Sequence, residues 1–120
     1  MMEKNDALKS KSMAFAIRIV RLYQYLTEKK KEFVLSKQLL RSGTSIGANR
    51  AEAQYAGSVK DFLLKNTIAL KECAETIFWL ELLSATGYLT SKQFTSVNAD
   101  CEKLLKMLIA ATRTLKGKTP

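Results

Sequence analysis

Proline is nearly absent from this chain, and that absence constrains the fold more than any other feature. The only proline among 120 residues is the last one, Pro120, and the five glycines leave long stretches uninterrupted. Because proline and glycine are the strongest helix breakers, such stretches favour α-helix. A chain of this length is typical of a single domain and too short for two hydrophobic cores. The sequence therefore predicts one all-α domain.

Apolar residues recur with helical spacing over four segments of the chain. In the first segment, for example, Phe15 and Ile19 fall on one helix face. The four expected helices run over about residues 13–26, 33–56, 59–86 and 91–116. Because their connections are short, they predict an antiparallel up-down-up-down four-helix bundle. We expect the bundle to occupy residues 13–116, between flexible tails at 1–12 and 117–120.

Local signals mark the ends of the last two helices. Ser58 is expected to cap the third helix, with the negative charge of Asp61 in its first turn. Gly87 stands where a helix commonly ends. Thr90 and Gln93 have the spacing of a capping box, in which each side chain bonds to the backbone of the other. These signals predict helix starts just after Ser58 and Thr90.

Two glycines and three polar residues interrupt the inward face of the second helix. Gly43 and Gly47 each cost a helix about 1 kcal/mol relative to alanine. Close approach of a neighbouring helix would offset this cost, and the alternative is a kink or short loop that splits the helix. Ser42, Ser45 and Asn49 need hydrogen-bond partners on such a face. We expect them to fix helix register or a subunit contact, and phosphate binding is the alternative.

The first and third helices carry more apolar surface than one core can bury. On the first helix the apolar arc spans about 220° of the circumference. On the third helix, Leu64 and Trp79 lie away from the main apolar stripe. Exposed apolar patches commonly mark association surfaces, and symmetric self-assembly is the most frequent form of association. We therefore expect a homo-oligomer.

Residue types that most catalytic and metal sites require are missing or unsuitably spaced. The chain has no histidine, which removes the commonest general base and a common metal ligand. Cys73 and Cys101 lack CxxC spacing and are expected to be buried as small hydrophobic residues. Glu72 and Glu75 lie one turn apart, but spacing alone does not make an acid/base pair. We expect no enzyme activity, no cofactor and no metal.

The apolar runs of the chain are all short. None reaches the roughly 20 residues that a membrane span requires. The N-terminal residues lack the apolar block of a signal peptide. We therefore expect a cytoplasmic protein without a membrane partner.

The chain is strongly basic. It contains 20 Lys and Arg against 11 Asp and Glu, for a net charge of +9, and such an excess indicates an anionic partner such as RNA or DNA. For any single residue, a solvated helix face is the alternative explanation. Because no recognition motif is present, binding is expected to be largely independent of nucleotide sequence. The candidate phosphate contacts are Arg18, Arg21, Lys37, Arg41, Arg50, Lys103, Lys106 and Arg113.

Several short segments together resemble one known family. They are VLSKQLLRSGTSIGAN at 34–49, EA at 52–53, KDF at 60–62, ALKE at 69–72, ET at 75–76, WL at 79–80 and TGYL at 86–89. Over about residues 13–115 the chain resembles the four-helix-bundle proteins encoded by intervening sequences of bacterial 23S rRNA genes, often labelled S23 ribosomal proteins. Arg50 departs from the family pattern, in which an aliphatic residue follows Asn49, and this puts the local packing there in question.

The resemblance implies a bundle that assembles into a ring-like homopentamer. It also implies kinship with the accessory variability protein of diversity-generating retroelements, a basic pentamer that partners a reverse transcriptase and associates with nucleic acid. Two functions are consistent with these features. The first is a non-enzymatic, self-associating scaffold that binds RNA or DNA. The second is an adaptor that binds a protein partner and whose charge serves mainly solubility.

Overall fold

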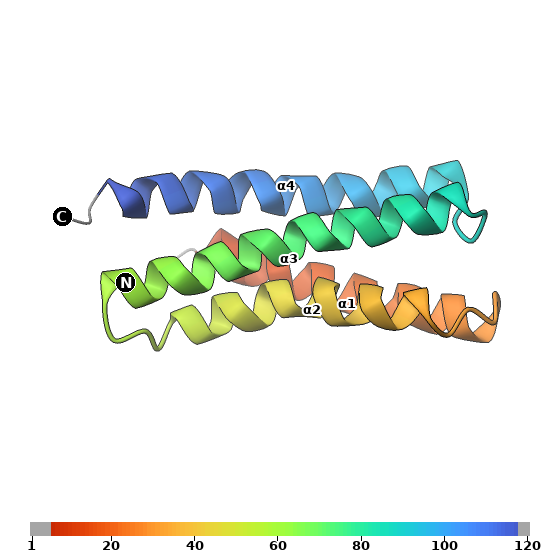
Figure 1. Ribbon diagram of the computed structural model, residues 1–120, viewed down its shortest axis with the longest axis horizontal. Coiled ribbons are helices and arrows are strands. Elements are labelled where there is room, and N and C mark those ends of the chain that lie inside the picture. Colours follow the sequence, from red (N-terminus) through yellow and green to blue (C-terminus); the bar gives the residue numbers. More distant parts are fainter. Residues whose placement is uncertain (1–5, 118–120) are drawn as a thin grey trace.

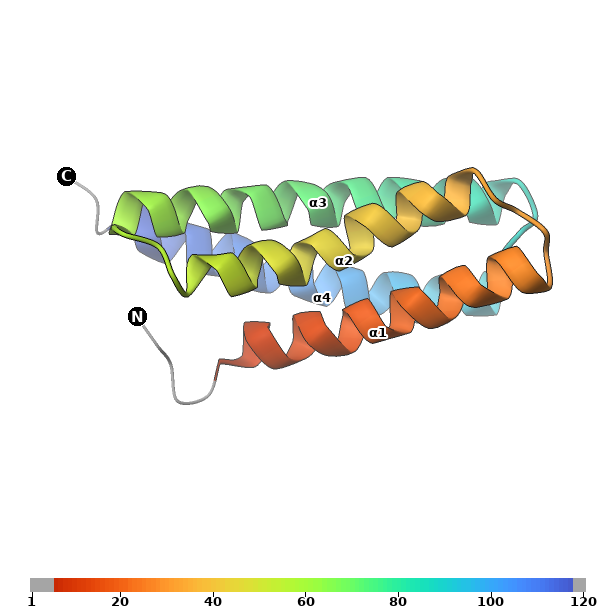
Figure 2. The same cartoon turned by 90° about the horizontal axis from the view of Figure 1, so that it is seen from below.

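Four α-helices build the protein in a computed structural model that describes residues 6–117. They are α1 (Ala7–Glu28), α2 (Leu35–Ala53), α3 (Val59–Ala85) and α4 (Ser91–Lys116), and no strand occurs within residues 6–117. The helices lie side by side in a bundle of 49 × 23 × 20 Å (Figure 1). Successive helices run in opposite directions (Figure 2). The prediction of an all-α four-helix bundle is confirmed, and the alternating directions agree with up-down-up-down order.

One apolar stripe from each helix forms the core. Helix α2 packs against α1 and α3, and α4 packs against α3 and, to a smaller extent, α1. Among residues 6–117, no Cα atom of α1 lies within 8 Å of one in α3, and the same holds for α2 and α4, so each of these pairs occupies one diagonal of the bundle. The largest fully buried apolar side chains are Ile19, Leu26, Leu39, Ile46, Leu80, Leu83, Leu104 and Leu108.

The two glycines of α2 lie against α1 at close range. A Cβ atom at Gly43 would stand 2.8 Å from Cγ1 and 2.9 Å from Cγ2 of Ile19. A Cβ atom at Gly47 would stand 3.4 Å from the carbonyl oxygen of Ser12. Helix α2 is continuous through both glycines. The glycine spacing therefore marks a close helix contact, and no loop splits the helix at this point.

The predicted helix caps of α3 and α4 are present. The N–H of Asp61 donates to Ser58 Oγ at 3.0 Å. Thr90 and Gln93 form the reciprocal capping box, at 3.1 Å and 2.8 Å. Gly87 adopts φ +86°, a left-handed conformation that favours glycine after a helix. Both boundaries follow from chemistry within a few residues of sequence.

Helix α1 begins at Ala7, six residues before the predicted start at Met13. The prediction of a flexible tail over residues 1–12 is therefore wrong for residues 7–12. The carboxylate of Asp6 caps the helix by accepting the N–H of Lys9 at 3.0 Å, and Leu8 is buried beyond it. Residues 1–5 and 118–120 lie outside the described residues, and Gly117 caps the end of α4.

Helix α2 begins at Leu35, two residues later than predicted, because Glu32 caps it. Its carboxylate accepts the N–H groups of Val34 (3.2 Å), Leu35 (3.0 Å) and Ser36 (2.7 Å). Burial raises the pKa of Glu32, but these backbone donors outweigh burial and the net pKa is lowered. The helix ends at Ala53 instead of the predicted Ala56, because the next three residues form hydrogen bonds to carbonyls three positions back.

We predict that Gly43→Ala lowers the free energy of unfolding by about 1–3 kcal/mol, because the new methyl group overpacks against Ile19. The gain in helix propensity of about 1 kcal/mol offsets part of this cost. Urea denaturation provides the measurement. Gly47→Ala is the matched control and should cost less, because its nearest neighbours stand at contact distance.

A double-mutant cycle isolates the cause of this effect. In an Ile19→Ala background both atoms that crowd Gly43 are gone, so Gly43→Ala should cost much less there than in the wild type. An equal cost in both backgrounds would show that the contact with Ile19 is not the reason for the glycine.

Candidate functional site

The predicted phosphate contacts fall into three groups in the structure. Arg21, Lys37, Lys103, Lys106 and Arg113 are exposed, and none of them forms an ion pair within the part of the chain that the structure describes. They come from three different helices: Arg21 from α1, Lys37 from α2 and the other three from α4. On α4, however, Lys103, Lys106 and Arg113 recur at three- and seven-residue spacing and share one outward face.

Two of the predicted contacts, the half-buried Arg18 and the exposed Arg41, are already paired. Arg18 of α1 forms an ion pair with Asp100 of α4 at 2.7 Å and donates to Ser96. Arg41 of α2 pairs with both Glu72 and Glu75 of α3. These arginines tie neighbouring helices together, so phosphate binding would compete with intramolecular carboxylates.

Arg50 is not on the basic surface. Only 6% of the residue is exposed, so the expectation of an exposed phosphate contact is wrong for this position. Its Nη1 donates to Asn66 Oδ1 of α3 at 2.8 Å, and its Nη2 pairs with Asp6 Oδ2 at 3.3 Å. The guanidinium lies over the ring of Phe62 at 5.0 Å, a cation–π contact. Arg50 thus joins α2 to the start of α1 and to α3.

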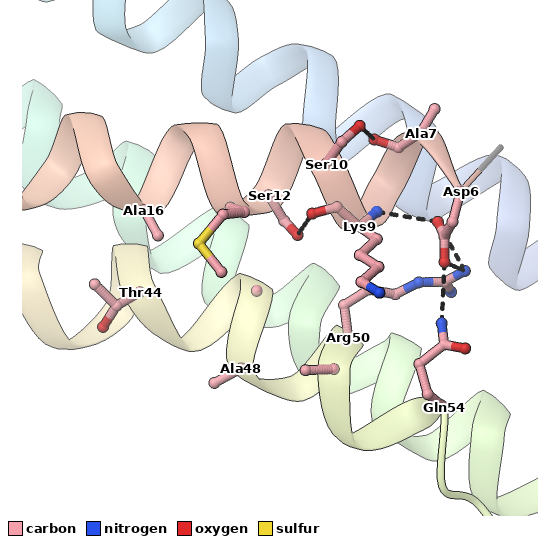
Figure 3. A pocket seen from close by; sticks show the side chains of 13 residues that line it. Asp6, Ala7, Lys9, Ser10, Ser12, Ala16, Thr44, Ala48, Arg50 and Gln54 are labelled. Atoms are coloured by element: carbon pink, nitrogen blue, oxygen red, sulfur yellow. Dashed lines mark hydrogen bonds and ion pairs between the residues drawn. The ribbon is translucent and has the colours of Figure 1, made fainter.

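Asp6 holds this arrangement together from the other side. Besides Arg50, its carboxylate accepts Gln54 Nε2 at 3.0 Å and the backbone N–H of Lys9 at 3.0 Å. Figure 3 shows Arg50 and Gln54 pointing from α2 toward Asp6. We call Asp6, Arg50, Gln54, Phe62 and Asn66 the Arg50 cluster. Three of its polar atoms have no hydrogen-bond partner: Arg50 Nε, Gln54 Oε1 and Asn66 Nδ2.

An open cavity of about 990 Å³ borders the Arg50 cluster. It lies between residues 6–16 and residues 44–54, and we call it the α1–α2 groove (Figure 3). Its α2 side consists mainly of small residues, among them Gly47, Ala48 and Ala51. This groove was not predicted from the sequence. Asp6 could have been recognised as a helix cap from its type and position, but no local pattern indicates its contact with Arg50.

The three polar residues predicted on the inward face of α2, Ser42, Ser45 and Asn49, have different hydrogen-bond partners. Ser42 is fully buried, and its Oγ accepts a hydrogen bond from Thr76 Oγ1 of α3 at 3.0 Å. Ser45 donates to the carbonyl oxygen of Arg41 at 2.6 Å, and Asn49 donates to that of Ser45 at 2.9 Å. Of the three, Ser42 alone bonds to another helix through its side chain among the described residues.

Cys73 and Cys101 are both free and fully buried, as predicted. Their Sγ atoms lie 3.9 Å apart across α3 and α4, a contact that their sequence positions did not indicate. The side-chain hydrogen bond to Cys73, together with burial, raises the pKa of the Cys101 thiol, which disfavours the reactive thiolate. Within residues 6–117 no three metal-binding side chains come together. None of the helices described there has both the length and the apolar character needed to cross a bilayer.

We predict that Asp6→Ala lowers the free energy of unfolding by about 2–4 kcal/mol, because it removes a helix cap and the counterion of a buried guanidinium. Asp6→Asn keeps a capping oxygen but not the charge, and should cost less than Asp6→Ala. The control is Asp100→Ala, which breaks the exposed pair with Arg18 and should cost about 0–1 kcal/mol. Urea denaturation compares the three, and equal losses for Asp6→Ala and Asp100→Ala would contradict the structural role of Asp6.

The chain is similar to known proteins over nearly the whole bundle. The family model of the 23S rRNA-intervening sequence protein matches residues 4–110. The chain is also similar to the crystal structure of a protein of unknown function from the S23 ribosomal protein family of Bacteroides thetaiotaomicron, with 54% identity and a TM-score of 0.87, covering 88% of this chain and 97% of that one. No curated protein matches. The chain therefore belongs to the 23S rRNA-intervening sequence protein family.

Proposed function

We propose that the protein is a non-enzymatic, self-associating cytoplasmic scaffold whose assembled copies present a basic surface to RNA or DNA. The observation that carries this proposal is the uncovered apolar surface on the two helices of one diagonal. We call Met13, Ile17 and Val20 the α1 patch. We call Val59, Leu64 and Phe78, which are spread along α3 with the exposed Lys71 between the last two, the α3 patch. All six side chains are exposed; the other large apolar side chains exposed within the described residues, Phe33, Val34 and Tyr55, lie in the connections at the two ends of α2.

The placement of the two patches favours head-to-tail assembly. Helices α1 and α3 stand at opposite corners of the bundle and do not contact each other. Each patch faces away from the core of its own protomer. When the α1 patch of one copy meets the α3 patch of the next, the contact is heterologous, and such contacts generate closed rings when the rotation closes. The family resemblance supports five copies in that ring.

The remaining diagonal supports the nucleic-acid role. In a ring joined through α1 and α3, the outer faces of α2 and α4 stay free. Helix α4 presents Lys103, Lys106 and Arg113 on one outward face. Repetition of this face around a ring would multiply the number of phosphates that are contacted at once, and phosphate contacts of this kind carry little sequence information.

Charged substitutions in either patch should dissociate the assembly. We predict that Ile17→Glu and Phe78→Glu each reduce the mass measured by light scattering toward the 13.5 kDa of one chain, because a buried, unpaired carboxylate opposes association. Ala99→Glu, on the exposed face of α4, is the matched control and should leave the mass unchanged. Circular dichroism verifies that each variant remains helical.

Mixing the two variants tests the head-to-tail geometry directly. Ile17→Glu keeps an intact α3 patch and Phe78→Glu keeps an intact α1 patch, so an equimolar mixture should form heterodimers through one intact contact. If α1 patches paired only with each other, Phe78→Glu alone would still associate. A wild-type protein that is monomeric at high concentration would refute the self-association proposal.

Binding to RNA should depend steeply on salt and on α4. We predict that affinity for a fluorescent single-stranded RNA falls sharply between 50 and 200 mM salt, because binding releases counterions. The double variant Lys103→Glu, Lys106→Glu should weaken binding by about tenfold or more at low salt. The control, Lys29→Glu, Lys30→Glu, makes the same charge change at the end of α1. Equal effects of the two variants would contradict a site on α4. Absence of RNA binding at low salt would refute the nucleic-acid role and favour the role of a protein adaptor.

A further inference from the structure

The α1–α2 groove has the dimensions of a small-molecule site. Its volume of about 990 Å³ is at the upper end of the roughly 300–1,000 Å³ that is usual for ligand pockets. Thr44, Gly47, Ala48 and Ala51 form its α2 side, and these short side chains leave space that larger ones would fill. Met13 and Ala16 lie on the opposite side, on α1. The body of the groove is therefore a mainly apolar trough.

One end of the groove is polar, with one unpartnered buried donor, Arg50 Nε, and one unpartnered buried acceptor, Gln54 Oε1. Arg50 lines it with a side chain that is only 7% exposed, and its Nε donor is unpartnered. Lys9 lies at the rim, exposed and without an ion pair among the described residues. The single carboxylate there, Asp6, already accepts hydrogen bonds from the backbone N–H of Lys9 and from the side chains of Arg50 and Gln54. With two cations against one anion, this end has an excess of positive charge.

From this arrangement we propose that the α1–α2 groove binds a small amphipathic carboxylic acid. The carboxylate lies at the polar end, where the exposed Lys9 supplies a donor and the buried guanidinium of Arg50 adds positive charge. The aliphatic body extends along the apolar trough toward Ala16 and Thr44. From Asp6 to Ala16 the helix rises about 15 Å, which matches an extended chain of about ten carbons.

This site goes beyond the scaffold function and does not depend on it. All of the groove lies within one protomer; Met13 of the α1 patch lines it, whereas the α3 patch and the outward lysines of α4 do not. It also depends on Arg50. An aliphatic side chain there would remove one of the two positive charges from the polar end.

Titration with decanoate tests the proposal. We expect decanoate, below its micelle concentration, to shift the backbone amide resonances of residues 6–16 and 44–54 in ¹H–¹⁵N spectra, with a saturable curve. The titration uses the full chain, both as the wild type and as Phe78→Glu. If Phe78→Glu binds decanoate and the wild type does not, the site lies within one protomer and the assembly covers it. Absence of saturable shifts in both proteins overturns the proposal.

Matched variants separate the proposed site from unspecific adsorption. Lys9→Glu should weaken decanoate binding by about tenfold, because it reverses one charge close to the carboxylate. Lys11→Glu makes the same change on the opposite side of α1 and should have little effect. Ala48→Trp should abolish binding by filling the trough, whereas Ala99→Trp on α4 should not.

The neutral analogue 1-decanol tests the role of the carboxylate. It should bind at least about tenfold more weakly than decanoate, because it lacks the charge that Lys9 and Arg50 attract. Equal affinities for the alcohol and the acid would overturn acid recognition, as would equal effects of Lys9→Glu and Lys11→Glu.

Discussion

The close approach of α1 to α2 at Gly43 is the contact on which the other features of this bundle depend. Ile19 lies against α2 at the point where Gly43 has no side chain, and Ser12 lies against Gly47 two turns further toward the N-terminus of α1. This proximity brings the start of α1 to the end of α2, where Asp6 meets Arg50. The ion pair between residues 44 positions apart is thus a consequence of a contact made by glycine. The same run of small residues leaves the outer side of the helix pair hollow as the α1–α2 groove.

Arg50 shows how the chain compensates for a costly residue. Removing a guanidinium from water costs several kcal/mol, and here the cost is offset by Asp6, Asn66 and the face of Phe62. The compensation is incomplete, because Nε of the same side chain has no partner. Replacing a buried ion pair by apolar residues is often neutral or stabilising. Stability alone therefore does not account for an arginine at this position.

The features that the sequence predicted correctly are those that local chemistry determines. Caps such as Ser58 and Thr90 act over three residues, and the four apolar stripes are set by helical spacing. The Arg50 cluster could not be found in this way, because its members are brought together only by the packing of three helices. For the same reason the charge count placed Arg50 among the exposed cations. A residue's type predicts its average environment, whereas its burial depends on residues far along the chain.

The division of the surface between the two diagonals connects the fold to its proposed function. Each helix needs only one stripe for the core, so additional apolar residues on α1 and α3 are not required for folding. On a monomer they would cost solubility without improving the core. On adjacent helices they would merge into one broad patch and favour a closed dimer. On opposite corners they leave two separate contacts per copy, and they keep the basic face of α4 outside both contacts. A ring joined in this way would bring the positive charges of several copies together and keep them accessible. When a long polyanion binds such a surface, many counterions are released, and this release favours binding.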